Sequence, residues 1–296
     1  MPGSLVEFSN EIADAVERAG AFVVGVLEGG REGVSGTVVR EGVAITAEHT
    51  IRGRDEVTVV LPSGDEVRAA VAGRDPGTDI ALLKLPATPE RARMAASLRV
   101  GEIVLLVGRR GAEGLAATYG IISAVGGPWR TWQGASIERS LRLDLNPFVG
   151  FSGGPIVNSA GEVLGMATSG ARRSVLTIPL GTLDRVVDQL IQHGRVRHSW
   201  IGVALQPVNF PSGGWQSLGI DNDLGLLVVT IASGSPAEQA GILLGDIIVN
   251  IEGSPVRGMR SLQSLLDSDK IGKSAAIQLV RGGRLVQITV AVGERP

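Results

Sequence analysis

A serine, an aspartate and a histidine stand far apart in the sequence, each in a context that suits nucleophilic catalysis. Ser152 lies in the glycine-rich stretch GFSGGP, His49 follows the mainly apolar run VAITAE, and Asp79 directly precedes the mainly apolar run IALLKL. A serine hydroxyl becomes a nucleophile when an imidazole accepts its proton and a carboxylate orients that imidazole. We therefore expect Ser152 to attack, His49 to act as the base and Asp79 to orient the His49 ring.

The residues around this serine could supply a second part of the same chemistry. The backbone amides of Gly150 and Ser152 would both point at the oxyanion that develops when a carbonyl is attacked. Glycine at position 150 permits the backbone conformation that such a loop requires. We expect these two amides to form an oxyanion hole.

Two serine signatures that belong to unrelated folds fit residues 150–154. One is Gly-x-Ser-x-Gly, the strand-to-helix elbow of the α/β-hydrolases, and the other is the Gly-x-Ser-Gly-Gly loop of trypsin-like proteases. The elbow needs a helix directly after its serine, whereas Pro155 follows here and residues 158–161 predict the turn of a hairpin. The order Ser, Asp, His would also have to use His193 or His198, at a predicted helix end and linker. We favour the protease loop and keep an ester-cleaving α/β-hydrolase as an alternative.

Composition and charge limit the class of protein. The 296 residues suffice for two domains, and 44% hydrophobic with 20% charged residues is ordinary for a globular chain. The formal net charge is −2 and no stretch concentrates lysine and arginine, so we expect no nucleic-acid partner. The chain has no cysteine, which excludes disulfides, thiolate catalysis and cysteine-bound zinc. We expect neither a metal nor a cofactor.

The spacing of apolar residues predicts a mainly β chain with few helices. An entry helix is expected over residues 4–19, with Ser4 as its N-cap. Short runs rich in valine and isoleucine follow without intervening helices, which favours antiparallel barrels or sandwiches. A further helix is predicted over residues 183–192, and Gly194 should end it.

The rest of the chain predicts a separate small domain. Several short apolar runs alternate there with helical pieces at residues 235–241 and 259–268. A compact α+β module of about 100 residues fits this pattern. We therefore expect one domain over residues 1–198 and a second over residues 199–296.

In their order and spacing these motifs resemble the HtrA (high-temperature requirement A) family of trypsin-like serine endopeptidases with C-terminal PDZ domains. The matching stretches are AITAEHTI, EVTVVLPSGDEVRAAVAGRDPGTDIALLKL, GFSGGPIVNSAGEVLGMATS, WIGVALQPV and GSPAEQAGILLGDIIVNIEGSPV. The resemblance covers the chain from about residue 20 onward, and it implies a trypsin-like double β-barrel protease domain followed by a PDZ domain. One departure is Phe151, where the family usually has asparagine, because a bulkier residue could alter the resting shape of the oxyanion loop.

The resemblance also implies two peptide-binding regions. The specificity pocket of the protease domain would be lined by Met166, Ala167 and Thr168 and by the loop before the serine, and it would favour small or medium aliphatic side chains. In the PDZ domain, backbone amides and the adjoining strand edge would capture an extended peptide. The residues implied there are Trp200, Ile201, Gly202 and Val203, together with three leucines that either face the groove or pack in the core, Leu262, Leu265 and Leu266.

For function, the resemblance implies an ATP-independent serine endopeptidase of bacterial protein quality control that cleaves unfolded or damaged proteins. Its PDZ domain would recognise C-terminal or apolar peptides. The alternative is a chaperone or scaffold whose triad is misaligned or switchable, with Phe151 as the residue that raises this question. A homo-oligomer, by resemblance a trimer, is expected, with the N-terminal segment around Phe8 as the contact surface.

The start of the chain bears on its location. The longest early apolar stretch, residues 19–27, is about a third to a half of a membrane span and follows a charged segment. The sequence as written therefore predicts neither a signal peptide nor a membrane anchor. On that basis we expect a cytoplasmic protein. A location in the cell envelope is expected if an N-terminal targeting segment has been removed.

Overall fold

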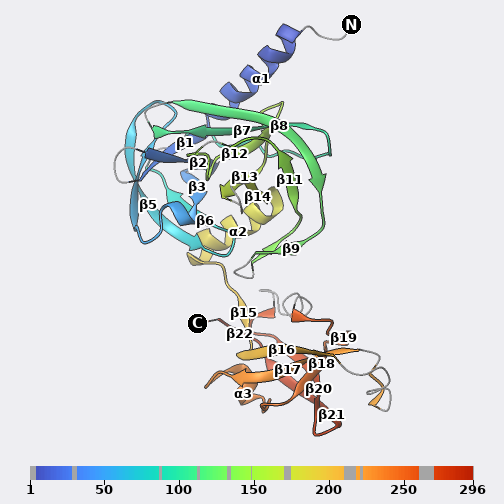
Figure 1. Ribbon diagram of the computed structural model, residues 1–296. Coiled ribbons are helices and arrows are strands. Elements are labelled where there is room, and N and C mark those ends of the chain that lie inside the picture. The colour runs from blue at the N-terminus through green and yellow to red at the C-terminus, as the bar shows by residue number, and fades with distance from the viewer. Residues whose placement is uncertain are drawn as a thin grey trace. The chain divides into compact units, whose positions relative to one another are not determined.

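Two compact units make up the chain, Met1–Val196 and Arg197–Pro296. The predicted boundary between residues 198 and 199 lies just beyond this division. Strands predominate in both units (Figure 1). The computed structural model describes residues 5–28, 32–86, 89–111, 114–131, 135–147, 149–169, 175–209, 218–220, 223–259 and 270–295.

The first six strands close into an antiparallel barrel in the order β1-β2-β3-β6-β5-β4. Each strand coincides with a run of valine, isoleucine or alanine, residues that suit a pleated, half-buried surface. A closed barrel leaves no free sheet edge. The strands are β1 (Val23–Glu28), β2 (Glu32–Arg40), β3 (Val43–Ala47), β4 (Glu56–Val60), β5 (Glu66–Asp75) and β6 (Ile80–Lys84).

A second six-stranded antiparallel sheet follows in the order β11-β8-β7-β12-β13-β14. Its outermost strands, β11 and β14, contact each other, so the sheet curls into a barrel-like form. A short hairpin of β9 (Trp129–Arg130) and β10 (Ser136–Ile137) forms a sheet of its own. The main strands are β7 (Ile103–Arg109), β8 (Leu115–Val125), β11 (Leu141–Asp144), β12 (Pro155–Asn158), β13 (Val163–Ser169) and β14 (Val175–Pro179).

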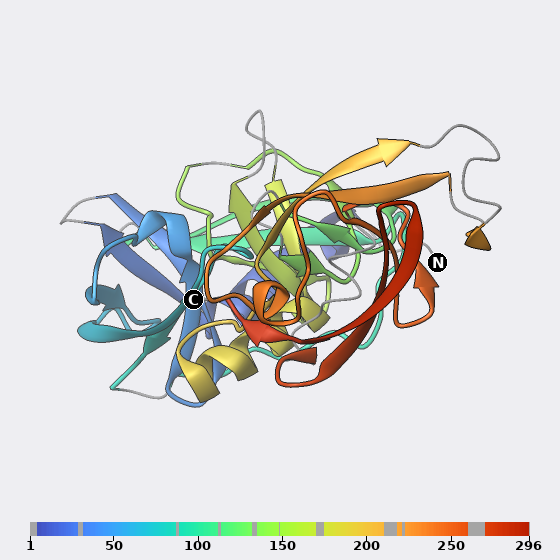
Figure 2. The same cartoon turned by 90° about the horizontal axis from the view of Figure 1, so that it is seen from below.

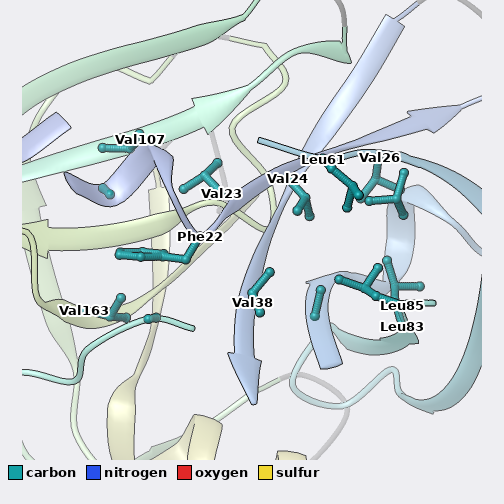
Figure 3. Packing of buried hydrophobic residues seen from close by; sticks show 14 of the residues in the cluster. Phe22, Val23, Val24, Val26, Val38, Leu61, Leu83, Leu85, Val107 and Val163 are labelled. Carbon is teal, nitrogen blue, oxygen red and sulfur yellow. The ribbon is translucent and has the colours of Figure 1, made fainter. Parts of the chain in front are cut away.

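The largest core cluster joins the barrel to the second sheet. Val24 and Leu83 of the barrel belong to the same buried cluster as Val107 of β7 and Val163 of β13. Figure 3 shows Phe22 lying close to Val163 within this cluster. Burying one such side chain contributes about 1.5–3 kcal/mol, so this shared core keeps the two sheets in one position relative to each other.

Two helices flank these sheets. Helix α1 (Leu5–Gly20) packs through the end that contains Ala15 and Ala19, while its N-terminal end projects from the barrels (Figure 1). Helix α2 (Leu180–His193) ends at Gly194, which has a φ of +70° and donates its N–H to Leu190 O at 2.9 Å. Both predicted helices are therefore confirmed, whereas the expected N-cap Ser4 lies outside the described residues. Within the described part of the chain, no helix is long and apolar enough to cross a membrane.

The segment after Ser152 is a hairpin, as the sequence predicted. Strand β12 begins at Pro155 and pairs with β13, and Gly161 occupies the turn with a φ of +78°. Asn158 Oδ1 accepts the N–H groups of Ala160 and Glu162 and so closes the turn. Because a strand follows the serine, the α/β-hydrolase elbow is wrong. The antiparallel sheets confirm the mainly β class.

The second unit is a small α+β domain built on one antiparallel sheet in the order β16-β17-β18-β20-β21, with β19 paired to β18. Strand β16 forms one edge and lies beside β17 (Figure 2). Helix α3 (Pro236–Gln239) begins at Ser235, whose hydroxyl caps it by accepting the Glu238 N–H. The strands are β15 (Ser199–Trp200), β16 (Val203–Asn209), β17 (Leu224–Ile231), β18 (Ile247–Ile251), β19 (Ser254–Pro255), β20 (Ser274–Arg281), β21 (Arg284–Ala291) and β22 (Gly293–Glu294).

Candidate active site

Asp79 holds both the backbone and the ring of His49. His49 lies in the 3-10 turn η1 (Glu48–Thr50) that follows β3, and Asp79 lies directly before β6, the strand that pairs with β3. Asp79 Oδ1 accepts the His49 N–H at 2.8 Å, and Asp79 Oδ2 lies 2.7 Å from His49 Nδ1. A carboxylate at Nδ1 keeps the proton on that nitrogen, which leaves Nε2 free to accept one.

The backbone of Asp79 is itself held in an uncommon conformation. Its φ is +60°, in the left-handed region that non-glycine residues rarely adopt. The Asp79 carbonyl accepts the Glu48 N–H at 3.1 Å, so the turn before β6 and the turn η1 are tied together. Such conformations persist where the surroundings determine them, and they are common at functional sites.

Thr168 is a third contact of this carboxylate. Its hydroxyl donates to Asp79 Oδ2, and its side chain is buried on β13. The sequence placed Thr168 in a specificity pocket. In the structure the Thr168 hydroxyl is hydrogen-bonded to Asp79, although the residue also lines the cavity described below. A hydroxyl that donates to the ionised carboxylate helps to hold it in position beside His49.

The pKa of His49 is raised above its ordinary value. The main cause is the hydrogen bond to Asp79, and the negative charges of Asp79 and Glu48 act in the same direction. Burial of the ring and the positive charge of Arg52 oppose the increase. Glu48 is itself buried, and its carboxylate contacts Arg52 at 3.3 Å and Arg74 at 3.9 Å. The sequence placed Glu48 next to His49 without predicting these partners.

Ser152 and His49 line the same cavity, which has a volume of about 600 Å³. Ser152 Oγ lies 3.3 Å from Ser169 Oγ. Among the described residues, no hydrogen bond joins Ser152 Oγ to His49. The structure therefore brings the serine, the histidine and the aspartate to one place, with the hydroxyl turned toward Ser169. Catalytic hydrogen bonds of this kind are often loose in the absence of substrate.

The loop that contains the nucleophile, residues 149–154, is called the oxyanion loop below. Gly150 has a φ of +99° and Gly153 a φ of +87°, which explains glycine at both positions. A Cβ on Gly153 would lie 2.1 Å from the Ser35 carbonyl oxygen, so the loop packs directly against β2. Gly150 lines the cavity together with Ser152.

Phe151 anchors this loop in the core. Its side chain is 3% exposed and belongs to the apolar cluster that contains Leu106, Ile156 and Ala167. A Cβ on Gly108 would lie 2.5 Å from the Phe151 ring, so glycine at position 108 makes room for it. The Phe151 side chain, which is bulkier than the asparagine usual in the resembled family, is thus accommodated in the core beside the second sheet.

Part of the cavity wall near Ser152 is apolar, and apart from His49 the polar side chains on it are hydroxyls. The apolar residues include Leu106, Val149, Ala167 and Val175, and none of the described lining residues is acidic. The prediction that Met166 lines this cavity is wrong, because its side chain is buried in a different cluster with Ile178 and the residues of α2. Successive residues of a strand point to opposite faces, so Met166 faces that cluster and Ala167 faces the cavity. The sequence reasoning missed Leu106 and Val175, and strand alternation predicts only that Met166 and Ala167 face opposite sides of the sheet.

Within the described residues, no three histidine, aspartate or glutamate side chains gather closely enough to hold a metal ion.

The second unit contains the predicted peptide-binding loop between β15 and β16. Gly202 has a φ of +82°, and a Cβ there would lie 2.2 Å from Ser235 Cβ. The carbonyls of Ile201 and Gly202 accept N–H groups of Ala237 and Ala232, so the loop is held from within the domain. The Ile201 side chain is buried in the core of this unit. The predicted leucines Leu262, Leu265 and Leu266 lie outside the described residues.

Known domain families match both units. The trypsin-like peptidase domain matches residues 34–166, and the PDZ domain matches residues 200–292.

Two proteins named probable periplasmic serine endoprotease DegP-like are similar over most of the chain. The protein from Brucella suis biovar 1 is 34% identical over 88% of this chain and 52% of its own length. That from Pseudomonas savastanoi pv. phaseolicola is 33% identical over 86% of this chain and 54% of its own length. The chain thus spans about half the length of the curated relatives it matches.

Solved structures resemble the chain over its whole length. The HtrA-type protease AlgW with decapeptide has a TM-score of 0.79 and 26% identity, covering 96% of this chain and 99% of that chain. The serine endoprotease from Yersinia pestis has a TM-score of 0.75 and 26% identity, and each chain is covered completely. The domain order, the relatives and these structures agree with one another: a trypsin-like peptidase domain is followed by a PDZ domain, and the chain is similar to HtrA-type serine proteases.

Proposed function

We propose that this chain is an ATP-independent serine endopeptidase that cleaves unfolded or damaged proteins. The observation that carries the proposal is the double hydrogen bond of Asp79 to His49, in the cavity that also contains Ser152. In this proposal His49 and Asp79 activate Ser152, and the amides of Gly150 and Ser152 bind the oxyanion.

The reaction would run in two stages. Ser152 Oγ attacks the carbonyl carbon of the peptide bond while its proton passes to His49 Nε2. Asp79 stabilises the imidazolium, and the amides of Gly150 and Ser152 donate to the oxyanion. The imidazolium then protonates the leaving amine, and a water molecule activated by His49 hydrolyses the acyl-enzyme. Before the attack, rotation of the Ser152 side chain must move Oγ from Ser169 toward His49.

The cavity supports a preference for apolar side chains at the residue before the cleaved bond. Leu106, Ala167 and Val175 offer no partner for a charged group, and burying an unpaired charge is costly. Small or medium aliphatic residues fit this wall. Unfolded proteins expose such residues in extended segments, which agrees with the proposed class of substrate.

The second unit supports recognition of peptides. Strand β16 is an edge strand that begins at Val203, directly after the loop of Trp200, Ile201 and Gly202. An extended peptide can add to such an edge through backbone hydrogen bonds. We therefore include binding of C-terminal or apolar peptides at this loop in the proposed function.

Two further features extend the proposal to assembly and location. The projecting end of α1 exposes Leu5, Val6 and Phe8, an apolar surface that a homo-oligomer, by resemblance a trimer, would cover. Two of the relatives carry names that place them in the periplasm. We therefore favour the cell envelope over the cytoplasm as the location.

Active-site labelling tests the proposed function directly. A biotinylated fluorophosphonate should react with the purified protein, and peptide mapping by mass spectrometry should find the label on Ser152. Casein should be cleaved without ATP, and a peptide with a free apolar C-terminus should be tested as an activator. Suppression of aggregation without labelling or cleavage, with or without that peptide, would favour a chaperone or scaffold instead.

The pH dependence of kcat/KM should report the His49 base. We expect an acidic limb above pH 6.5, the ordinary imidazole pKa, because His49 must be neutral to accept the Ser152 proton and its pKa is raised. Activity should rise with pH through that raised pKa. Stability should respond in the opposite sense, since a raised folded-state pKa contributes stability below about pH 6.5 that is lost as pH rises through the folded value.

The measurement is kcat/KM for a peptide substrate between about pH 5 and 9, compared with an NMR titration of the His49 ring. His193→Gln, at the end of α2, serves as a matched control that should keep the same limb. An acidic limb that does not coincide with the His49 titration would contradict the assignment of His49 as the base.

A further inference from the structure

We propose that Ser35 is a positioning residue that holds the oxyanion loop in its working conformation. The inference rests on the proposed function, because it assigns a role in the same reaction. Ser35 lies on β2 of the first barrel and is completely buried. The oxyanion loop belongs to the second sheet, so any contact between the two crosses from one barrel to the other.

The Ser35 side chain makes two hydrogen bonds that together determine its orientation. Its Oγ accepts the Arg109 N–H at 3.0 Å and donates to the Gly150 carbonyl oxygen at 2.8 Å. A hydroxyl has one hydrogen and two lone pairs. Because Arg109 N–H can only donate, the single hydrogen of Ser35 is directed to Gly150.

The Ser35 backbone contacts the loop a second time. Its N–H donates to the Ser152 carbonyl oxygen at 3.0 Å, and its own carbonyl accepts the Thr46 hydroxyl at 2.7 Å. The loop is thus held at the carbonyls of Gly150 and Ser152. These are the two residues whose amides would bind the oxyanion.

The bond to Gly150 constrains the peptide unit that separates those two amides. A peptide group is planar, so fixing the Gly150 carbonyl also fixes the direction of the Phe151 N–H. The Phe151 side chain is buried in the core, which restrains the following residue as well. Turning the Gly150–Phe151 peptide, which links the two oxyanion donors, would therefore have to break the Ser35–Gly150 bond.

Arg109, whose backbone N–H donates to Ser35, is itself held by hydrogen bonds. The buried guanidinium of Arg109 donates to the carbonyls of Val23 at 2.8 Å and Gly20 at 3.1 Å. Its backbone N–H is therefore anchored where β7 meets the end of α1 and the start of β1. A hydroxyl at position 35 connects this anchor to the oxyanion loop.

The space around Ser35 admits only a small side chain. A Cβ on Gly108 would lie 2.6 Å from Ser35 Oγ, and a Cβ on Gly154 would lie 3.3 Å from Ser35 Cβ. Alanine would fit here but would leave the Gly150 carbonyl and the Arg109 N–H without this partner. Ser35→Ala therefore tests the hydroxyl with little change in volume.

Ser35→Ala is expected to lower kcat for a peptide substrate by about 10- to 100-fold, less than the loss of an oxyanion donor itself. KM should change by less than about threefold, because Ser35 touches no substrate. The inhibition constant of a peptide aldehyde, which forms a tetrahedral adduct with Ser152, should rise by the same factor as kcat falls. Binding of the corresponding peptide amide should be unchanged.

Two further variants separate positioning from folding. Thr177→Val removes a hydroxyl that is as deeply buried, on β14, and has no hydrogen-bond partner among the described residues, so kcat should be unchanged. Ser35→Cys introduces a slightly larger side chain with a weaker donor and should give an intermediate kcat. Urea unfolding should show all variants folded under assay conditions. If Ser35→Ala does not fold, the Ser35→Cys values of kcat and aldehyde inhibition decide.

The outcomes separate this inference from the proposed function. An active wild type with an unchanged kcat and aldehyde inhibition constant in folded Ser35→Ala would overturn the role of Ser35 alone. Equal losses in peptide-amide binding and kcat would also overturn it, since they indicate a general structural effect. A wild type that neither cleaves casein nor reacts with the fluorophosphonate would overturn the proposed function, and the inference with it.

Discussion

Replacing Ser152 with alanine is expected to lower kcat for casein by a factor of about a million, the effect of removing the nucleophile from a serine protease triad. The substitution deletes the attacking oxygen, and neither His49 nor the oxyanion loop can replace it. Residual hydrolysis should remain above the uncatalysed rate, because an oxyanion hole and substrate binding still act. Fluorophosphonate labelling should disappear with the hydroxyl.

The fold should survive this change. Within the described structure, the Ser152 hydroxyl pairs with Ser169 Oγ at 3.3 Å, and its residue is half-buried. The unfolding midpoint in urea should therefore stay close to that of the wild type. Ser123→Ala, which removes an exposed hydroxyl on β8 outside the cavity, is a matched control that should keep full activity. Equal casein cleavage by Ser152→Ala and the wild type would contradict the assignment of the nucleophile.

Asp79→Asn should give the second largest loss, a fall in kcat of about ten thousandfold, as in triads where the aspartate is replaced in this way. An asparagine can place its NH₂ group against His49 Nδ1, so that Nδ1 accepts and the proton moves to Nε2. The nitrogen that faces Ser152 would then be unable to act as the base. The His49 pKa should also fall, because the largest cause of its increase is the bond to Asp79.

Kinetics and NMR together would test this prediction. The loss should be measured as kcat on a peptide substrate, and the His49 titration should move to lower pH. Asp184→Asn, at a half-buried carboxylate outside the cavity that pairs with Arg40 at 3.0 Å, is a matched control with little expected effect on either. The double variant Asp79→Asn, Ser152→Ala should be no slower than Ser152→Ala alone, since the two residues act as a unit. Full activity of Asp79→Asn would contradict the role of the carboxylate.

Much of the fold follows from local patterns. The valine-rich runs became the strands of two antiparallel sheets, and Gly194 ended α2 as expected. The turn at residues 158–161 predicted a hairpin after Ser152, and this excluded the α/β-hydrolase elbow. These features depend on neighbouring residues, so sequence periodicity and turn chemistry suffice to predict them.

The detail of the cavity could not be predicted in the same way. Met166 and Ala167 are both apolar neighbours on β13, and only the packing of α2 decides that Met166 faces the core and Ala167 the cavity. The hydroxyl of Thr168 could line a pocket or donate to a carboxylate. It donates to Asp79 because β13 and β6, which belong to different sheets, pack together through a shared core cluster.

The sequence by itself determined the residue types of the site, their order along the chain and the family that they indicate. It also marked Phe151 as unusual. Only the tertiary structure decided that the Phe151 ring lies in the core and that Ser35, 115 positions before Gly150, holds the oxyanion loop. The physical reason is that local spacing governs strands and turns, whereas a contact between barrels depends on how two complete sheets pack through a shared core.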